Sequence, residues 1–569
     1  MPHILVLVAL PLFVGAYLYN LARKRRYSNQ FANFPRPEEP SLIWGHIPVM
    51  QRMLQVSREA LHFDVMIHQL VKRIGNPSVM LMDMRPIGYP MAIVTSHEVA
   101  EQLTKPSKMF PWSTPKSPTI GEFDRLIGPT SMISRNGEHW KETRKRFNPG
   151  FAPQHLMTLL PCILDKTAIF VDRLEGWAKT DQEFGLTKAL IDLTFDIIGA
   201  VVMDVDFDAQ HFSSTTRTGK FIRLYESLVN TYSRRTAGRP WWLFPRRILK
   251  RYLLSRQIDA VLKEIIYEKF DEQRGQSSLT AQNKQAARSV LNLSLQGHQV
   301  LTEPLLVETM DSIKTFLFAG HDTTSIVLSW AFYYLAQYPA CQKALFDELD
   351  SLFGKDTNPE TVRRKLLSPG GQELINRMPY ATAVIKETLR VRPPAGSARM
   401  TPPGTGLVVR TPEGQDLCLD GMIVYLCATI IQRDKTVYGD TADEFVPERW
   451  LNDKSGIMSD TASDEKEDLP TDRKYPAGAW RPFERGPRNC IGQDLATIEA
   501  RVILAVVARR FEFVKVGLGE LERDEKGRGV FEAGEEGRKY RLKGEELYNT
   551  SQITAKPIDW MKMKVRIRS

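Results

Sequence analysis

Residues 483–492 read Phe-Glu-Arg-Gly-Pro-Arg-Asn-Cys-Ile-Gly, and a helical pattern follows over residues 494–505. Cys490 therefore stands where a loop enters a helix, between Gly486 and Gly492. A helix N-terminus favours a thiolate over a thiol, and glycine permits positive φ and close approach of the backbone to a ligand. Such a thiolate would be a soft metal ligand or a nucleophile. A lone cysteine is more often a buried structural residue, so Cys490 by itself leaves that alternative open.

The cysteine pattern argues against two kinds of structural site. The five cysteines are scattered along the chain, and no Cys-x-x-Cys pair occurs. An odd, dispersed set is not expected of a disulfide framework or of a structural zinc site. The pattern is typical of a chain that faces a reducing compartment.

The longest helical pattern covers residues 305–337 and is apolar on most faces, as expected of a buried central helix. Its middle reads Ala-Gly-His-Asp-Thr-Thr at residues 319–324. Gly320 costs about 1 kcal/mol relative to alanine, Thr323 can bond back to a carbonyl, and a buried Asp322 is costly unless it is used. Several residues that are each unfavourable in a buried helix occur together here, and such a combination indicates a functional site. The alternative is a kink that only makes packing space, and His321 receives no role.

Two further pairs of residues have helical spacing. Glu387 and Arg390 are three residues apart, and Trp140 and Arg144 are four apart, so each pair shares one helix face. On its own, the first pair is most simply an exposed salt bridge worth less than about 1 kcal/mol. The second pair on its own is compatible with a surface stack of arginine on tryptophan.

Together these motifs resemble those of the cytochrome P-450 family, whose haem-binding loop reads Phe-x-x-Gly-x-Arg-x-Cys-x-Gly. Phe483, Gly486, Arg488, Cys490 and Gly492 fill every fixed position of that loop. The resemblance implies that Cys490 is the axial ligand of the haem iron and that Arg488 meets a haem propionate. Thiolate ligation favours cleavage of the O–O bond.

The resemblance continues in the family's order from about residue 35 to the end of the chain. It implies a buried ion triad of Glu387, Arg390 and Arg449, the last in Pro-Glu-Arg at residues 447–449. The triad would lock the architecture and do no chemistry. The resemblance also implies two catalytic residues on the distal side of the haem, with Thr323 as the hydrogen-bonding residue and Asp322 as a proton relay.

The implied cofactor is haem b, held between the long helix and the Cys490 loop. Trp140 and Arg144 would lie beside its propionates. Arg399 is a weaker propionate candidate, because its spacing from other motifs is loose.

The substrate pocket is expected to combine three segments. They are residues 110–134, Phe316 and Ala319 of the long helix, and the small residues of 395–398. The last run is small enough to leave volume near the iron, which favours a bulky apolar substrate.

The N-terminus predicts a membrane anchor. Residues 4–19 are wholly apolar or aromatic, and Arg-Lys-Arg-Arg follows at residues 23–26. A spanning helix needs roughly 17–25 residues, and flanking positive charge stays on the cytoplasmic side. A cleaved signal peptide would carry its positive charge before the apolar run, and here the order is reversed. We expect residues 1–27 to be a single-pass anchor in the endoplasmic reticulum membrane, with residues 28–569 as a haem-thiolate domain facing the cytosol.

The expected fold is mainly α in one large domain, with a small β-rich part near residues 80–100 and 395–430. A Pro-rich segment at residues 34–40 reads as a stiff hinge. Two polar stretches, residues 453–472 and 517–543, are expected to be surface insertions that carry no chemistry.

The net charge of +10 suits nucleic acid, anionic lipid or an acidic protein partner. Nucleic acid is disfavoured, because no zinc-finger spacing, RNP-type sequence or basic zipper occurs. No flavin or nicotinamide fingerprint accompanies the domain, so electrons are expected from another protein. The resemblance implies an NADPH-dependent cytochrome P-450 reductase, with cytochrome b5 as a further donor.

Two basic regions suggest contact surfaces. One set of basic residues would form a reductase docking patch with those of its members that are exposed: Lys141, Arg144, Lys145, Arg146, Arg481 and Arg485. The alternative is that they form only a solvated basic face. Residues 233–252 mix aromatic and basic side chains, which suits contact with the bilayer and entry of apolar substrates from lipid. The alternative for this segment is a basic exposed loop.

These expectations converge on a membrane-bound haem-thiolate monooxygenase that oxidises a hydrophobic small molecule with O2 and electrons from NADPH through a reductase. Residues 479–496 resemble microsomal members from filamentous fungi, many of which serve secondary metabolism. Two alternatives remain: the same fold with isomerase, dehydratase or peroxide-driven chemistry, and a non-catalytic haem-binding membrane protein. The presence of both Asp322 and Thr323 disfavours both alternatives.

Overall fold

The computed structural model of the 569-residue chain describes residues 2–27, 29–58, 60–211, 216–232, 244–276, 289–451, 475–526, 528–535 and 537–568. The chain divides into two compact units, each assembled from three segments. Unit 1 contains residues 1–119, 396–442 and 476–489, and unit 2 contains residues 120–395, 443–475 and 490–569. The sequence had suggested a single large domain.

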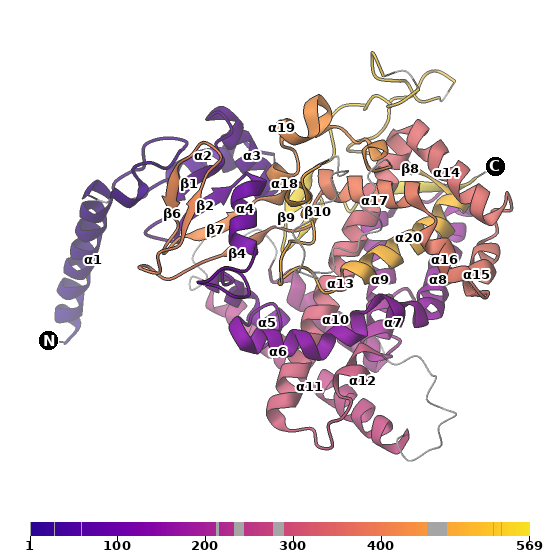
Figure 1. Ribbon diagram of the computed structural model, residues 1–569, viewed down its shortest axis with the longest axis horizontal. Helices are drawn as coiled ribbons and strands as arrows, with labels where there is room; N and C mark the ends of the chain where they lie inside the picture. The colour runs from indigo at the N-terminus through magenta and orange to yellow at the C-terminus, as the bar shows by residue number, and fades with distance from the viewer. Residues whose placement is uncertain are drawn as a thin grey trace. The chain divides into compact units, whose positions relative to one another are not determined.

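Unit 1 is built on a four-stranded sheet with the strand order β1-β2-β7-β4 (Figure 1). β1 pairs antiparallel with β2, β2 pairs in parallel with β7, and β4 pairs antiparallel with β7. The parallel pair aligns Met91 with Ile423 and Val94 with Leu426, which joins segments far apart in the sequence. Buried aliphatic side chains of these strands pack with those of α4 and form the core of the unit.

The helices and strands of unit 1 have the following bounds: α1 (Pro2–Tyr27), α2 (Ile47–Val56), α3 (Phe63–Arg73), β1 (Val79–Asp83), β2 (Pro90–Val94), α4 (His97–Thr104), β4 (Ser397–Arg399), β5 (Val408–Arg410), β6 (Asp416–Cys418), β7 (Ile423–Leu426), α18 (Ala428–Ile431) and α19 (Lys435–Tyr438).

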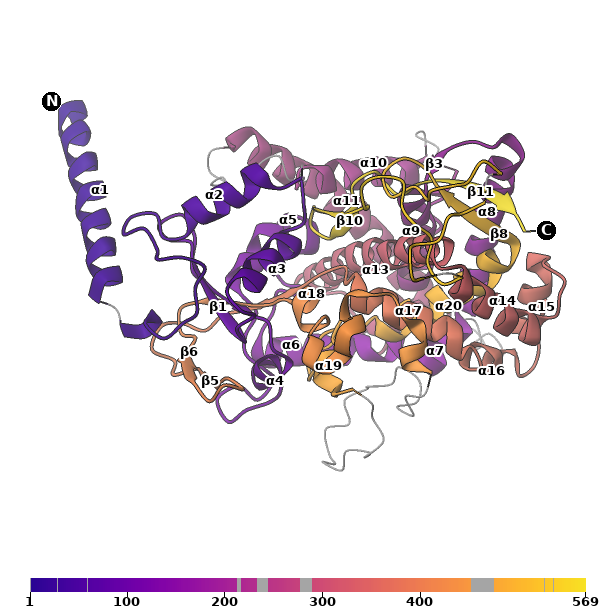
Figure 2. The same ribbon diagram turned by 90° about the horizontal axis from the view of Figure 1, so that it is seen from above.

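Unit 2 is mainly helical and is organised around α13 (Glu303–Gln337). At 1.5 Å per residue its 35 residues span about 50 Å. Figure 2 shows α13 running lengthwise through the unit, with α9 beside it and α17 and α20 along another side. Most of its side chains are buried, because helices cover it along nearly its whole length. The sequence predicted this helix over residues 305–337, so its position and length are confirmed.

The remaining helices and strands of unit 2 have the following bounds: α5 (Asp124–Ile127), α6 (Gly137–Phe147), α7 (Pro153–Thr158), α8 (Leu160–Thr180), β3 (Phe184–Gly185), α9 (Leu186–Met203), α10 (Arg217–Asn230), α11 (Pro245–Gln276), α12 (Val290–Ser294), α14 (Pro339–Phe353), α15 (Pro359–Leu367), α16 (Gly371–Asn376), α17 (Pro379–Val391), α20 (Gln493–Arg510), β8 (Phe511–Lys515), β9 (Asn549–Ser551), β10 (Ala555–Pro557) and β11 (Lys562–Ile567). Unit 2 also contains the short 3-10 helices η3 (Asn148–Phe151) and η8 (Pro447–Trp450).

Close packing of α9 against α13 explains the glycine in the middle of the long helix. A Cβ atom added to Gly320 would lie 2.6 Å from Ile198 Cδ1 and 2.7 Å from Ile198 Cγ1. Beside it, Thr194 Oγ1 of α9 donates a hydrogen bond to the carbonyl oxygen of His321 at 2.8 Å. The missing side chain therefore lets the two helices approach each other, which fixes the position of the residues that follow Gly320.

The C-terminal part of unit 2 contacts α13. Strands β9 and β10 form an antiparallel hairpin, and Trp330 Nε1 of α13 donates a hydrogen bond to Asn549 Oδ1 of β9 at 3.0 Å. The polar stretch 517–543 is described except for residues 527 and 536. Its Tyr540 N donates to the carbonyl oxygen of Gln337, the last residue of α13, at 2.9 Å. The other predicted insertion, residues 453–472, lies outside the described residues.

The predicted anchor region forms the helix α1 (Pro2–Tyr27), and the side chains of residues 2–10 and 24–27 lie outside the description. No helix in the described parts of the chain has the length and apolar character needed to cross a membrane.

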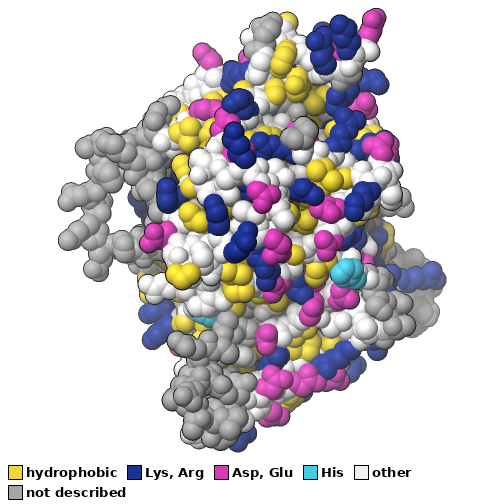
Figure 3. Space-filling view, turned by 90° about the vertical axis from the view of Figure 1, so that its right-hand side faces the viewer, with side chains coloured by type: hydrophobic (Ala, Val, Ile, Leu, Met, Phe, Trp, Pro, Cys, Tyr) yellow, Lys and Arg dark blue, Asp and Glu magenta, His cyan; other side chains and the backbone are white. Residues whose placement is uncertain are grey.

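Charge is mixed on the face seen in Figure 3. There, basic and acidic side chains are interspersed with hydrophobic ones and are not segregated by sign. The excess positive charge of the chain is therefore not gathered on this face.

Candidate functional site

Cys490 belongs to unit 2 and lies directly before α20, which begins at Gln493. Cys490 is an exposed residue, whereas Cys341 and Cys427 are buried. Burial raises the pKa of Cys162 to about 11 and that of Cys341 to about 12. Those two thiols are therefore protonated at neutral pH, and Cys490 is the cysteine whose position suits a ligand.

The two glycines that flank Cys490 differ in their backbone requirements. Gly486 has φ of +74°, and an added Cβ atom would lie 2.1 Å from the carbonyl oxygen of Thr104 at the end of α4. Glycine is therefore needed there for both conformation and space. Gly492 has φ of −87°, which any residue can adopt. A positive φ thus occurs at Gly486 and not at Gly492, where close approach of the backbone to a ligand stays a prediction.

The loop before Cys490 lies in unit 1 and is fastened to α4. Arg481 is buried, and its Nη2 donates to Thr104 Oγ1 at 3.2 Å and to Glu484 Oε1 at 2.7 Å. Phe483 is partly exposed and packs edge-on against Trp480, and Arg488 is buried. Burial of Arg481 removes it from the predicted docking patch, because a guanidinium enclosed by its own loop cannot meet a partner.

Arg399 on β4 is fully buried in unit 1, with an exposed fraction of 0%. Its Nη1 reaches the carbonyl oxygen of Thr114 at 3.4 Å, but Nε and Nη2 have no hydrogen-bond partner among the described residues. A buried guanidinium with unused donors is costly unless an anion accepts from it. Arg399 therefore fits the carboxylate of a cofactor, and a haem propionate is such a group.

Trp140 and Arg144 lie on α6 in unit 2. Trp140 is buried, and Arg144 Nε donates to Asn148 Oδ1 at 2.9 Å. Burial lowers the pKa of Arg144, and the negative charge of Cys490 opposes that shift. Arg144 is therefore placed close enough to Cys490 for the two charges to interact, within the same unit.

The helix α13 is mostly buried, but it is partly exposed around Thr323. Phe318, Ala319, Gly320 and Thr323 are partly exposed, whereas most residues around them are buried. Thr323 Oγ1 donates to the carbonyl oxygen of Ala319 at 2.8 Å, which is the back-bond that the sequence predicted. This partly exposed stretch is where a ligand could contact α13.

Two pocket residues suggested by the sequence have other roles. Phe316 is buried and packs edge-on against Phe147 and Phe151, with ring centroids 5.0 and 5.1 Å apart, so it belongs to the core. A Cβ atom on Gly396 would lie 2.3 Å from the hydroxyl oxygen of Tyr425. The small size of Gly396 therefore serves packing against Tyr425, and the pocket assignments of Phe316 and Gly396 are wrong for this reason.

Asp322 is buried in an ion pair that the sequence did not predict. Lys556 Nζ lies 2.5 Å from Asp322 Oδ1, and the hydroxyl of Thr554 donates to Oδ2. The two carboxylate oxygens are thus occupied by the β9–β10 hairpin, and His321 Nε2 lies 3.8 Å from Oδ1. Burial lowers the pKa of His321, although Asp322 raises it in part, so the imidazole is neutral at pH 7.

The Glu387 carboxylate is the centre of a buried network in unit 2. Arg390 Nη2 lies 2.8 Å from Glu387 Oε1, and Arg449 Nε lies 3.0 Å from the same atom. The exposed fraction of Glu387 and Arg390 is 0%. Val446 N and Trp450 Nε1 also donate to the carboxylate, each at 2.9 Å. The network joins α17 to η8, and Trp450 is the member that sequence reasoning missed, although it directly follows Arg449.

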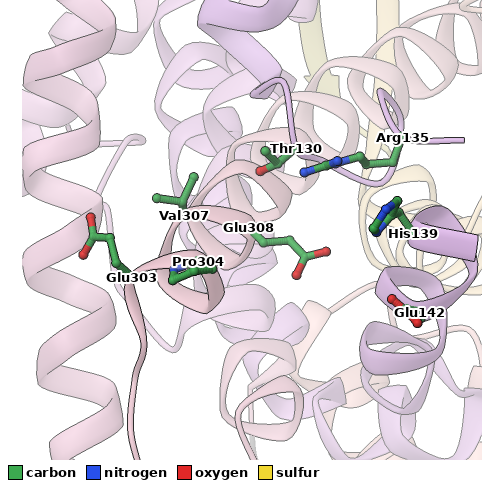
Figure 4. Close-up of a pocket in the computed structure, with 8 residues that line it drawn as sticks. All are labelled: Thr130, Arg135, His139, Glu142, Glu303, Pro304, Val307 and Glu308. Carbon is green, nitrogen blue, oxygen red and sulfur yellow. The ribbon is translucent and has the colours of Figure 1, made fainter.

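A pocket of about 470 Å³ opens elsewhere in unit 2, between α6, α13 and the loop before α6 (Figure 4). Its lining is largely charged: Thr130, Arg135, His139, Glu142, Glu303, Pro304, Val307 and Glu308. Glu308 is fifteen residues before Thr323 on α13, which corresponds to about 22 Å. The pocket is therefore remote from the partly exposed stretch at Thr323 and is not a candidate for the site of chemistry.

The comparisons with known proteins agree with the site. The family model named Cytochrome P450 matches residues 41–533. The chain is 31% identical over 499 residues to cytochrome P450 monooxygenase acrF of Aspergillus aculeatus, covering 85% of this chain and 93% of that protein. It is 27% identical over 551 residues to cytochrome P450 monooxygenase polC of Polytolypa hystricis, covering 95% and 90%.

A solved structure shows the same fold. The crystal structure of the cytochrome P450DA heme domain matches with a TM-score of 0.65 and 17% identity, covering 94% of this chain and 98% of that chain. The chain therefore belongs to the cytochrome P450 family and is a monooxygenase of that family. The family implies a haem cofactor. In unit 2, Cys490 and the partly exposed stretch of α13 fit that group. In unit 1, taken by itself, the unused donors of Arg399 fit a carboxylate such as a propionate.

We predict that Glu387→Gln lowers the free energy of unfolding by roughly 3–5 kcal/mol, because Arg390 and Arg449 would be left without a buried counter-charge. Urea unfolding of the haem-loaded protein measures the change. Asp347→Asn on α14 is a matched control, since its ion pair with Lys343 is exposed and is worth less than about 1 kcal/mol. A loss from Glu387→Gln as small as that of the control would contradict the prediction.

Proposed function

We propose that this chain is a membrane-bound haem-thiolate monooxygenase that oxidises a hydrophobic small molecule in fungal secondary metabolism. The observation that carries the proposal is the exposed residue Cys490 directly before α20, within a loop that matches the family at every fixed position. The two fungal relatives named as monooxygenases support the biological setting. Electrons would come from NADPH through a separate reductase.

Some residues of the proposed site would hold the cofactor, and others would transfer protons. Bound haem b with a cysteine thiolate supplies activation of molecular oxygen. Cys490 would ligate the iron, and Arg399, Arg488, Trp140 and Arg144 would hold the propionates.

Proton handling falls to Thr323 and Asp322. Thr323 Oγ1 holds a proton at the partly exposed stretch of α13, and its neighbour Asp322 is the carboxylate through which a proton would pass. Presence of both groups favours oxygen insertion over isomerase, dehydratase or peroxide-driven chemistry.

Lys556 would control the availability of the Asp322 carboxylate. The ion pair keeps Asp322 turned toward the β9–β10 hairpin, and the Thr554 hydroxyl occupies its second oxygen. For Asp322 to pass a proton to Thr323, one of these contacts has to loosen. The C-terminal hairpin therefore belongs to the proton-handling part of the site in this proposal.

The membrane anchor would be α1. Where side chains of α1 are described, large apolar residues such as Leu12 and Phe13 are exposed, with fractions of 68% and 73%. Contact with lipid would cover them, and the basic residues at 23–26 would keep the following chain in the cytosol. We expect the full chain to sediment with microsomes after carbonate extraction. A chain that lacks residues 1–27 should be released into the supernatant.

A second membrane contact would involve the start of α11. Ile248, Leu249, Tyr252 and Leu253 are exposed there among basic residues, which suits an interfacial helix. Residues 233–243 of the predicted contact segment lie outside the described residues. Loss of vesicle binding by Leu249→Glu/Leu253→Glu in a chain lacking residues 1–27 would support this contact, and unchanged binding would refute it.

The reductase would dock on α6. Lys141 and Lys145 are exposed and share one face of the helix, whereas Arg146 is engaged by Glu308 at 3.5 Å. An acidic partner would be attracted to this face, and salt would weaken the attraction. Cytochrome b5 is a further partner of the same chemistry.

We predict that Cys490→Ala abolishes the ferrous–carbon monoxide spectrum of thiolate-ligated haem and all product formation. Cys162→Ala is the matched control, because its thiol is protonated and it lies outside the haem loop. The assay supplies O2, NADPH and reductase, and mass spectrometry of the products looks for a gain of one oxygen atom. Turnover that persists in Cys490→Ala, or that needs neither O2 nor NADPH, would refute the proposed function.

We predict that Lys556→Met lowers the free energy of unfolding by roughly 3–5 kcal/mol, because it leaves Asp322 as an uncompensated buried charge. The double variant Lys556→Met/Asp322→Asn should recover much of that loss. Asp322→Asn alone should form more peroxide per NADPH consumed, since proton delivery would be impaired. Product yield per NADPH equal to that of the unsubstituted enzyme would remove Asp322 from the proposed proton path.

We predict that Lys141→Glu/Lys145→Glu slows reduction by the reductase at least several-fold at low salt and flattens its salt dependence. The double variant Lys343→Glu/Lys355→Glu is the control, because these lysines are also exposed but lie on and beyond α14. Equal slowing in both variants would argue for a general charge effect and against docking on α6.

A further inference from the structure

Glu484 occupies a position that the haem-loop pattern leaves free, yet its environment is unusual. Its φ is +59°, a left-handed conformation that a residue with a side chain rarely adopts. Its side chain is only 13% exposed. Strain of this kind persists only where surrounding contacts hold it, and it often marks a functional constraint. No role in holding the cofactor follows from the family pattern at this position.

The two oxygens of Glu484 lie against two different arginines. Oε1 accepts from Arg481 Nε at 3.1 Å and from Arg481 Nη2 at 2.7 Å. Oε2 lies 4.0 Å from Arg399 Nη2. The backbone N–H of Glu484 donates to the carbonyl oxygen of Arg481 at 3.1 Å, which closes a tight turn. The strained backbone thus places one carboxylate between two buried guanidinium groups.

The charge of this group is not balanced within unit 1. Arg399 and Arg481 are both buried, and Glu484 is the carboxylate that lies against both. The nearby Glu101 is engaged by Arg485 at 3.0 Å and lies 3.7 Å from Arg481. The Arg399–Arg481–Glu484 group therefore carries two guanidinium charges and one carboxylate charge, and among the described residues its donors without a hydrogen-bond acceptor are on Arg399.

The ionisation of these groups follows from their contacts. Burial alone would raise the pKa of Glu484, but Arg481, Arg399 and Lys116 outweigh it, and the pKa is lowered. Burial lowers the pKa of Arg399, an effect that Glu484 opposes and Arg481 reinforces. Glu484 therefore carries a full negative charge at neutral pH.

We propose that Glu484 is a positioning residue for the cofactor, which bridges Arg399 and Arg481, aims the unused donors of Arg399 at a haem propionate, and lowers the reduction potential of the bound haem through its negative charge. The inference rests on the proposed function, because it requires haem in the Cys490 loop. It adds a charge-setting residue that makes no contact with the iron.

The direction of the effect follows from electrostatics. A negative charge near the haem disfavours the gain of an electron, and in a buried loop water screens it weakly. Removal of the Glu484 charge should therefore raise the reduction potential. Removal of the Arg399 charge should lower it, and removal of both should return it toward the original value.

The test is a spectroelectrochemical titration of the full-length, haem-loaded protein. Four variants are compared with the unsubstituted chain: Glu484→Gln, Glu484→Gly, Arg399→Gln, and Glu484→Gln/Arg399→Gln. Glu484→Gly removes the charge and also relieves the positive φ, so it guards against misfolding of Glu484→Gln. Glu38→Gln is the control, since Glu38 lies in the same unit in an exposed pair with Arg52.

The expected result is a rise in potential for both Glu484 variants, a fall for Arg399→Gln, a return toward the original value in the double variant, and no change for Glu38→Gln. Haem should also leave Glu484→Gln faster, measured by its transfer to an apo-globin. An unchanged potential in Glu484→Gln and Glu484→Gly with an intact thiolate spectrum would overturn the inference. Failure of all Glu484 variants, the double variant included, to load haem would overturn it as well. If the unsubstituted chain itself lacks the thiolate spectrum, the proposed function fails first.

Discussion

Compensation of buried charge is the constraint on which the rest of this structure depends. Glu387 has no contact with water, and its carboxylate is stable there only because two guanidinium groups, an indole N–H and a backbone N–H surround it. These donors come from α17 and from residues 446–450, so the need to pair one carboxylate fixes the relation of two segments that are about sixty residues apart. A hydrophobic residue would not impose such a specific arrangement, because apolar contacts are not directional.

The need to compensate buried charge also distinguishes the charged residues that stabilise the fold from those that could bind a ligand. The Glu387 network is fully satisfied, and its residues have no free group to offer to a ligand. Asp322 is paired with Lys556, but its Oδ1 atom receives no hydrogen bond from the described residues, whereas both oxygens of Glu387 accept hydrogen bonds. Arg399 is the opposite extreme, since two of its donor atoms are buried and no described residue accepts a hydrogen bond from them. The buried carboxylate of Glu387 thus has hydrogen-bond partners at both oxygens, whereas Asp322 and Arg399 each have atoms without one among the described residues.

Motifs with short spacing were predictable from the sequence. The α13 helix, the Cys490 loop and the Glu387–Arg390 pair each depend on residues within a few positions of one another, and local spacing determines which of them share a face. Strands β2 and β7 fall within the β-rich part that the sequence predicted near residues 80–100 and 395–430. The partners of Asp322 were not predictable, because Thr554 is 232 residues away and nothing in its local sequence distinguishes it. Phe316 and Gly396 were misassigned because an apolar or small residue can serve a core or a pocket equally well.

The sequence by itself determined the family, the cysteine that can ligate iron, and the helix that carries Asp322 and Thr323, since these follow from residue type and periodicity. Only the tertiary structure decided how each buried charge is neutralised. It placed Lys556 against Asp322, put Glu484 between Arg399 and Arg481, and left Arg399 with unused donors. The physical reason is that the cost of a buried charge depends on distances to groups anywhere in the chain, and the fold alone sets those distances.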